Sequence, residues 1–173
     1  MNEVLKQMKS RRSVRSFTDE QVREADLSAV LDAAVWAPSG LNAQSSRIVV
    51  LQKKEDIEEL RRLNASLMGD DSRDPFYGAP TVLVVLADPS AMTYLENGCL
   101  LLGSLLLAAY SVGLGSCWIH RAKEEFESEE GKAMLRRWGI PENYVGIGHC
   151  ILGYPKDGFP EPKPRNEGLV IRP

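Results

Sequence analysis

Residues 97–119 read NGCLLLGSLLLAAYSVGLGSCWI and contain no charged side chain. The helix expected at 91–112 is apolar around almost its whole circumference, so it must be covered on more than one side. Asn97, glycines and serines interrupt the run, which favours a buried core helix over a membrane span. The Gly113-Leu114-Gly115 step is typical of a helix end, and we expect a short strand after it, at 115–120.

The helix at 91–112 also bears on assembly. In one domain of 173 residues, one side of such a helix faces the core of its own chain. The other side is best covered by a second copy of the chain, and small residues would allow close helix contact: Gly98, Gly103, Ser104, Ala108 and Ser111. The sequence therefore predicts an obligate homodimer.

The segments around this helix alternate between strand and helix patterns. β-branched or apolar runs predict strands at 47–51, 81–87 and 144–152. Apolar residues at helical spacing predict helices at 2–10, 23–37, 54–67 and 124–138. Residues 68–76 are polar and are predicted to form a mobile surface loop. Because no repeat, low-complexity tract or internal boundary divides the chain, we expect a single domain over residues 1–173.

The composition is that of a soluble globular chain, with 43% hydrophobic residues and a formal net charge of -3. That charge argues against a partner that is nucleic acid or an anionic membrane surface. The three cysteines, Cys99, Cys117 and Cys150, are odd in number and have apolar neighbours. They favour a reducing compartment, hence the cytoplasm, over a disulfide framework. The first residues lack the apolar core of a signal peptide.

A cluster of cations stands near the N-terminus, in the stretch Arg11-Arg12-Ser13-Val14-Arg15-Ser16-Phe17. Three neighbouring guanidinium groups repel one another unless an anion lies among them. The rigid fork of donors on arginine matches phosphate or carboxylate. Because the whole chain is acidic, a small anion is favoured over a polyanion. A solvated basic turn is the alternative at this point.

A loop of small and amide side chains is expected at 37–46, where the sequence reads Ala-Pro-Ser-Gly-Leu-Asn-Ala-Gln-Ser-Ser. Asn42 and Gln44 each offer a donor and an acceptor, which is the pattern needed to read the edge of a heterocycle. A plain turn is the alternative.

Other cofactor and metal patterns fail on their context. A dinucleotide fingerprint needs a strand before its glycines, but Gly113-Leu114-Gly115 follows a helix and Gly146-Ile147-Gly148 lies within a strand. No metal site or Cys–His dyad is predicted, because the possible pairs point to opposite strand faces: Cys117 with His120, and His149 with Cys150. With only two histidines, the chain has little acid–base equipment, so an enzyme of this sequence would need a cofactor.

Five pieces of the chain resemble, in order, motifs of the FMN-dependent nitroreductase family. Arg11–Phe17 resembles its N-terminal flavin-phosphate motif, and Ala37–Gln44 resembles its Ala-Pro-Ser-x-x-Asn-x-Gln loop. The remaining pieces are Gly78-Ala79-Pro80, Gly113–Ile119 (Gly-Leu-Gly-x-Cys-Trp), and Gly153-Tyr154-Pro155 followed by Lys163-Pro164-Arg165. The match extends from about Leu5 to Arg165. The chain departs from the family where Gln44-Ser45-Ser46 replaces Gln-Pro-Trp, and its middle is short.

The resemblance implies an α+β fold: a mixed, largely antiparallel sheet flanked by helices, with a long apolar dimer-interface helix. It implies that the FMN phosphate is held by Arg11, Ser13, Lys163 and Arg165, with Arg12 close by. Arg15 would lie by the N1–C2 edge of the flavin. The other subunit would contribute Pro38, Ser39, Gly40 and Asn42, in the loop that also carries Gln44. Beside the ring would run Trp118, Ile119, His120 and Arg121.

The resemblance further implies an oxidoreductase in which NAD(P)H reduces the flavin and a nitroaromatic, quinone or similar acceptor reoxidises it in a ping-pong cycle. Hydride would pass through flavin N5, so no catalytic side chain is expected. Leu169–Ile171 could join the partner's sheet, and His120-Arg121 could tune substrate charge or be a surface pair. Two alternatives stay open: other flavin chemistry, such as oxidation, dehalogenation or flavin breakdown, and a non-enzymatic binder of phosphorylated metabolites.

Overall fold

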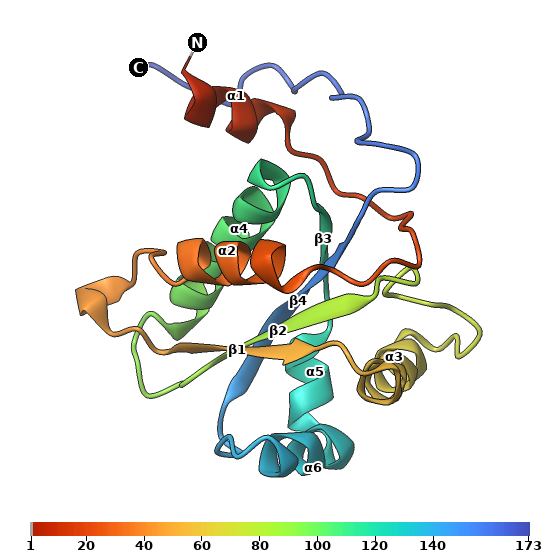
Figure 1. Cartoon of the computed structure of the whole chain (residues 1–173). Helices are drawn as coiled ribbons and strands as arrows, with labels where there is room; N and C mark the ends of the chain where they lie inside the picture. Colours follow the sequence, from red (N-terminus) through yellow and green to blue (C-terminus); the bar gives the residue numbers. More distant parts are fainter. Residues whose placement is uncertain (1) are drawn as a thin grey trace.

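A four-stranded sheet lies between two layers of helices in the computed structural model, which describes residues 2–173 and leaves Met1 outside (Figure 1). The strands are β1 (Ser46–Leu51), β2 (Thr81–Ala87), β3 (Gly115–Ile119) and β4 (Val145–Gly153). They pair in the order β1-β2-β4-β3, and each neighbouring pair is antiparallel. An isolated bridge between Ser13 and Ser116 adds a parallel contact at the outer edge of β3.

All the α-helices but the first divide between the two faces of the sheet, and the first has no buried residue. The helices are α1 (Glu3–Ser10), α2 (Glu24–Ala34), α3 (Lys54–Met68), α4 (Tyr94–Ser111), α5 (Ala122–Glu127) and α6 (Glu129–Arg137), with a short 3₁₀ turn η1 (Gly40–Asn42). Residues of α2 and α4 share one hydrophobic cluster, and residues of α3, α5 and α6 share the other. Because both faces of β2 are covered, all of its seven residues are buried, which explains its uninterrupted apolar sequence.

Helix α4 packs one side against the sheet. Leu101, Leu102 and Leu105 are buried there, and Gly98 lies so close to β4 that an added Cβ would stand 2.5 Å from Cγ1 of Ile147. The opposite side leaves Leu100 47% exposed. Within residues 2–173, no helix is long and apolar enough to cross a membrane.

Two of the expected helices have different bounds in the structure. The helix predicted at 23–37 ends at Ala34. Residues 35 and 36 form a turn, and Pro38 disfavours helical geometry in Ala37, the residue before it. The helix predicted at 124–138 is two helices, α5 and α6, that meet at Ser128. The backbone of Ser128 is extended and its Oγ accepts a hydrogen bond from Gly131 N at 3.0 Å, so it starts a new helix.

Candidate functional site

The amide loop expected at 37–46 is anchored on α4 by one buried side chain, Asn97. The Oδ1 atom of Asn97 accepts a hydrogen bond from Gly40 N at 2.9 Å, and its Nδ2 donates to Ser45 Oγ at 3.0 Å. Within the loop, Gln44 N donates to Ser39 Oγ at 3.1 Å. From the sequence, Asn97 is only a polar interruption of an apolar helix; its role in holding the loop depends on contacts across the fold.

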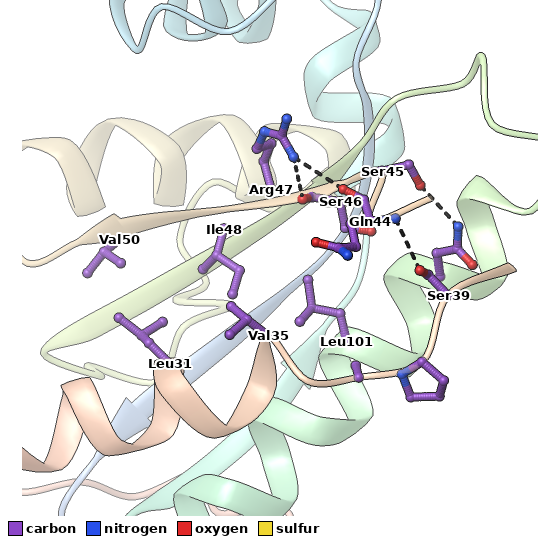
Figure 2. A pocket seen from close by; sticks show the side chains of 13 residues that line it. Leu31, Val35, Ser39, Gln44, Ser45, Ser46, Arg47, Ile48, Val50 and Leu101 are labelled. Carbon is purple, nitrogen blue, oxygen red and sulfur yellow. Dashed lines mark hydrogen bonds between the residues drawn. The ribbon is translucent and has the colours of Figure 1, made fainter. Parts of the chain in front are cut away.

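A cavity of about 420 Å³ lies between this loop, β1 and the ends of α2 and α4 (Figure 2). Its volume is in the range of small-molecule sites. Three residues expected to bind cofactor line it, Pro38, Ser39 and Gln44, together with the apolar side chains of Leu31, Val35, Ile48 and Leu101. The cavity thus joins the amide loop to an apolar wall at the β1 edge of the sheet.

The amide loop has an unusual backbone. Leu41, Asn42 and Gln44 have φ angles of 52°, 54° and 47°, in the left-handed region that residues other than glycine seldom adopt. Leu41 is 98% exposed at the tip of the loop. The hydrogen bonds to Asn97 and within the loop hold this conformation against its local cost, which is of order 1–3 kcal/mol for each such residue.

The arginine cluster lies along the outer edge of β3. Val14 N donates to Ser116 O at 2.9 Å, and Val14 is buried against Gly115, where any Cβ would lie 2.9 Å from the valine. Further along, Phe17 pairs with Pro155. Three of the five motif pieces, Arg11–Phe17, Gly113–Ile119 and Gly153–Pro155, are therefore brought together in the fold.

Two of the three guanidinium groups in this cluster have buried nitrogens without a partner: Arg11 Nη1 and Arg12 Nε. Another nitrogen of Arg12, Nη1, donates to the carbonyl oxygen of Arg11. An unpaired buried N–H of a charged group is costly, and an anion would satisfy it. Because both side chains are only partly exposed, the alternative of a freely solvated basic turn does not describe them.

The third guanidinium, that of Arg15, is placed differently. Arg15 is exposed, and its Cζ lies 5.9 Å from the ring centroid of Tyr77, close enough for a cation–π contact. Burial, with a smaller effect of Cys117, raises the pKa of the Cys150 thiol, and Arg11 opposes that rise.

The C-terminal tail carries the other two expected phosphate ligands, Lys163 and Arg165. Both are exposed, and in the described part of the chain neither makes a hydrogen bond or an ion pair. The tail packs on α4 through Phe159 and Tyr110, whose ring centroids are 4.7 Å apart, and then runs back toward the end of the molecule that carries α1 (Figure 1).

The residues expected beside the flavin ring occupy the end of β3 and the turn after it. Trp118 packs on Gly148, where a Cβ would lie 2.7 Å from the indole Nε1, and Ile119 is buried. The strand ends at Ile119, so His120 lies outside it and is exposed. Arg121 follows with a φ of 77° and a half-buried side chain.

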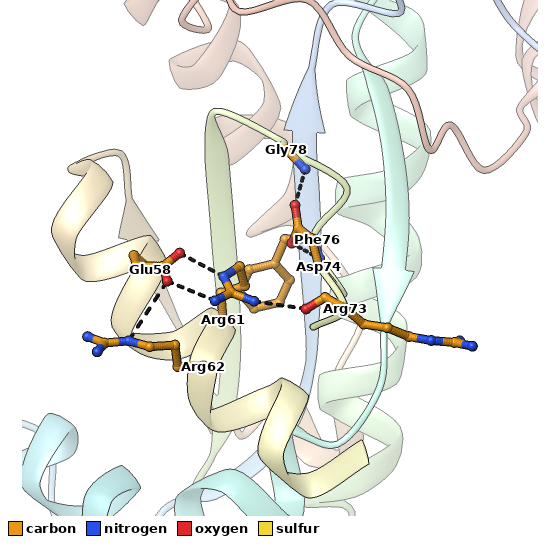
Figure 3. Close-up of polar contacts among 7 residues, drawn as sticks. All are labelled: Glu58, Arg61, Arg62, Arg73, Asp74, Phe76 and Gly78. Carbon is orange, nitrogen blue, oxygen red and sulfur yellow. Dashed lines mark hydrogen bonds and ion pairs between the residues drawn. The ribbon is translucent and has the colours of Figure 1, made fainter. Parts of the chain in front are cut away.

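The segment 68–76, predicted to be a mobile surface loop, ends with a side chain in the core. The two carboxylate oxygens of Asp74 accept hydrogen bonds from Phe76 N at 2.8 Å and from Gly78 N, and Arg61 Nη1 donates to Arg73 O at 2.8 Å (Figure 3). Phe76 is 1% exposed. Its ring makes an edge contact with His149, with the ring centroids 5.5 Å apart.

A second group of polar residues, missed from the sequence, lies behind the end of β3. Asn64, Glu125 and His149 are completely buried, and His149 Nε2 is 2.6 Å from Glu125 Oε2. Asn64 stands four residues after Leu60, on the buried side of α3, which is the one signal that could have found it. Among residues 2–173, no group of three or more His, Cys, Asp or Glu side chains is arranged to hold a metal ion.

Beside the edge strand β3, Arg11 and Arg12 each hold a buried guanidinium nitrogen without a partner, and such forked cationic donors suit a phosphate group. A family model described as the nitroreductase family matches residues 8–154. The chain belongs to the nitroreductase family. The resemblance drawn from the five motifs is thereby confirmed, as are the α+β fold and the assignment as a flavin oxidoreductase.

Individual relatives cover nearly the whole chain. A protein of Archaeoglobus fulgidus, provisionally named an NADH dehydrogenase/NAD(P)H nitroreductase, is 33% identical over 91% of this chain and 88% of its own. An iodotyrosine deiodinase of Thermotoga neapolitana is 31% identical over 94% of this chain and 93% of its own. The crystal structure of a nitroreductase with bound FMN from Bacteroides fragilis has a TM-score of 0.90 at 29% identity and covers 99% of both chains.

Proposed function

We propose that this protein is a homodimeric FMN-dependent oxidoreductase that takes electrons from NAD(P)H and passes them to nitroaromatics, quinones or similar acceptors. The observation that carries the proposal is the pair of buried, unpaired nitrogens on Arg11 and Arg12, in a chain similar to a nitroreductase solved with FMN. The donor is suggested by the name of the Archaeoglobus fulgidus relative.

The residues at the edge of β3 suit the phosphate of FMN. Arg11, Arg12 and Ser13 supply two charged groups and a hydroxyl on one short stretch, and Lys163 and Arg165 add further cations when the tail approaches. A phosphate near charge -2 needs several such donors. In this arrangement the isolated chain holds part of the clamp, and the tail or a second subunit completes it.

Bound FMN would supply reversible hydride transfer at its N5 atom. The role of the protein would be to position and polarise the flavin ring. The guanidinium of Arg15 would favour negative charge at the N1–C2 edge, while the backbone of residues 118–121 runs along the other side. A single pocket would receive NAD(P)H first and the electron acceptor after NAD(P)⁺ has left, which is a ping-pong order of binding.

The amide loop supports an assembly of two chains. Figure 1 shows the loop that contains Pro38–Gln44 on the opposite side of the molecule from the segment that follows α1, and in the described residues no hydrogen bond joins the loop to Arg11–Arg15. The loop is fixed in a strained shape, and large apolar side chains are exposed around it: Trp36 at 87%, Leu41 at 98% and Met92 at 88%. In our proposal this surface faces a second copy, and the loop reaches the partner's flavin.

The tail would add to the same assembly. Leu169, Val170 and Ile171 are 69–82% exposed and belong to no strand in the single chain. Strand β1 is at the edge of the sheet, with unpaired backbone groups that could accept another strand. We place the tail of one subunit on the β1 edge of the other.

The absorption spectrum of the purified protein tests the proposal. We expect a yellow protein whose flavin bands bleach on anaerobic addition of NADPH or NADH and return when a nitroaromatic or quinone is added. Protein that is colourless and takes up no FMN at micromolar concentration would contradict the proposal.

A second candidate function keeps the flavin and changes the reaction. The similarity to an iodotyrosine deiodinase over nearly the full chain favours reductive dehalogenation. Two measurements separate the candidates: bleaching by NAD(P)H supports the reductase, whereas flavin that is bleached only by dithionite and reoxidised by an iodophenol, with release of iodide, supports the dehalogenase.

A further inference from the structure

Three fully buried polar side chains cross one hydrophobic cluster beneath the end of β3. Asn64 belongs to α3, Glu125 to α5 and His149 to β4, and each is 0% exposed. Burying such groups costs free energy unless they are hydrogen-bonded to one another. The three residues form one connected network of contacts. This network ends at the turn after β3, where it contacts both backbone and side chain.

Asn64 is the centre of this network because both its amide nitrogen and its amide oxygen are hydrogen-bonded. Its Nδ2 donates to the carbonyl oxygen of His120 at 3.0 Å and to Glu125 Oε1, and its Oδ1 accepts from Arg121 Nε at 3.1 Å. The other oxygen of Glu125 pairs with His149 Nε2 at 2.6 Å. The carboxylate therefore fixes which way the amide of Asn64 points, and leaves its oxygen toward Arg121.

The turn that Asn64 holds is strained, and it presents a guanidinium group that is only partly used. Arg121 has a φ of 77°, a conformation that needs support from its surroundings in a residue other than glycine. Within residues 2–173 its Nε is engaged by Asn64, but neither terminal nitrogen has a hydrogen-bond or ion-pair partner. Two parallel donors thus remain free for an anion.

The same buried residues connect Arg121 with Arg15. His149 contacts Phe76 edge-on, the neighbouring Tyr77 has a φ of 55°, and its ring lies beneath the guanidinium of Arg15 at 5.9 Å. Two arginines, one exposed and one half-buried, are therefore supported by the same group of buried residues, beside the strand β3 where we place the flavin.

We propose that Arg121 binds a carboxylate of the electron acceptor and that Asn64 is the residue that positions it. The inference rests on the proposed function, since it needs a flavin beside residues 118–121. A single guanidinium with two free parallel donors matches the two oxygens of a carboxylate, whereas a phosphate near charge -2 would need more cations than this turn provides.

The experiment compares two ligands of equal shape that differ in charge, benzoate and benzamide. Their dissociation constants are measured on the oxidised, FMN-loaded protein from the change in flavin absorption, and the ratio of kcat/KM is measured for 4-nitrobenzoate and 4-nitrobenzamide. For Arg121→Gln we expect benzoate to bind roughly 10-fold more weakly relative to benzamide, because a charged hydrogen bond is lost. Asn64→Leu should lower the same ratio, and the double variant should lower it no further than Arg121→Gln alone.

Arg62→Gln is the matched control, since it removes an exposed charge from the same helix as Asn64 and should leave the ratio unchanged. If Asn64→Leu weakens both ligands equally, Asn64 is only structural and its positioning role is wrong. An unchanged ratio in Arg121→Gln overturns the whole inference, and this test does not need a folded Asn64 variant. Asn64→Asp keeps the shape of the side chain and is the second variant, for use if Asn64→Leu does not fold. A wild-type protein without flavin would instead overturn the proposed function.

Discussion

Arg11 is the single residue whose replacement tests the phosphate site most directly. Arg11→Gln should weaken FMN binding by roughly 10- to 100-fold, because one charged hydrogen bond to a phosphate contributes about 1.5–3 kcal/mol. Without FMN, the variant should be no less stable than the wild type, because the nitrogen removed is buried and unpaired. Fluorescence titration with FMN and urea unfolding of the FMN-free protein measure the two effects.

Lys9→Gln is the control for Arg11, since it removes an exposed positive charge from the last turn of α1. An equal loss of FMN affinity in Lys9→Gln would show that binding depends on general charge and not on the Arg11 side chain.

Asp26 should make stability depend on pH in the acid range. Its carboxylate accepts hydrogen bonds from Arg23 Nε at 2.9 Å and from Tyr154 OH at 2.7 Å, and these contacts, that of Arg23 first, lower its pKa below the ordinary value of 3.8. A carboxyl whose pKa is lowered on folding stabilises the native state above its unfolded pKa, and this contribution is lost as the pH falls through the folded value.

The Asp26→Asn variant has no carboxyl group at this position, so it loses this pH-dependent contribution to stability. Its free energy of unfolding should therefore fall less than that of the wild type when the pH is lowered from about pH 7 to about pH 3. Urea unfolding at the two pH values measures the difference. Identical losses in wild type and variant would show that the Asp26 contacts do not contribute to stability in solution.

At the scale of elements, α4 can lie close to β4 because Gly98 has no side chain. In Gly98→Ala the new methyl group would meet Cγ1 of Ile147 at 2.5 Å, so helix or strand must shift. We expect a loss of about 1–3 kcal/mol in the free energy of unfolding, in spite of the better helix propensity of alanine. Thermal or urea unfolding measures it.

Ile147→Ala provides the matched background for Gly98→Ala. Because it removes the side-chain atoms nearest to the new methyl group, the Gly98→Ala change should cost less in that background than in the wild type. If the cost is the same in both, the close approach of α4 and β4 is not its cause.

At the scale of the whole molecule, α4 has one side in the core and one side open. Leu100 lies on the open side and is 47% exposed. Leu100→Glu should give a monomer at micromolar concentration and should also lose FMN, because our proposed site needs both subunits. Sedimentation velocity and the flavin absorption of the same sample measure the two effects.

Leu67→Glu is the control for this substitution, since Leu67 is 42% exposed on α3, a helix on the other face of the sheet. The variant should stay dimeric and yellow. A wild-type protein that binds FMN as a monomer would contradict the two-subunit site.

The types of the elements could be predicted from the sequence because helix and strand periodicity are local properties. All four strands and the helices at 2–10, 54–67 and 91–112 appear where the patterns placed them, within a few residues. The division at Ser128 was missed, although serine favours the N-cap position; the same break brings Gly131 against the backbone of Glu125, where a Cβ would lie 2.0 Å from the carbonyl oxygen.

The sequence by itself determined the family, since five short motifs in order carry that information in residue identity alone. The tertiary structure decided which side chains act together. Residue identity did not distinguish Arg11 and Arg12, with their buried unpaired nitrogens, from the exposed Lys163. Nor did it connect Asn64 with Glu125, 61 residues away. Burial and hydrogen bonding are properties of contacts between distant parts of the chain, and those contacts exist only once the sheet and its two helical layers have formed.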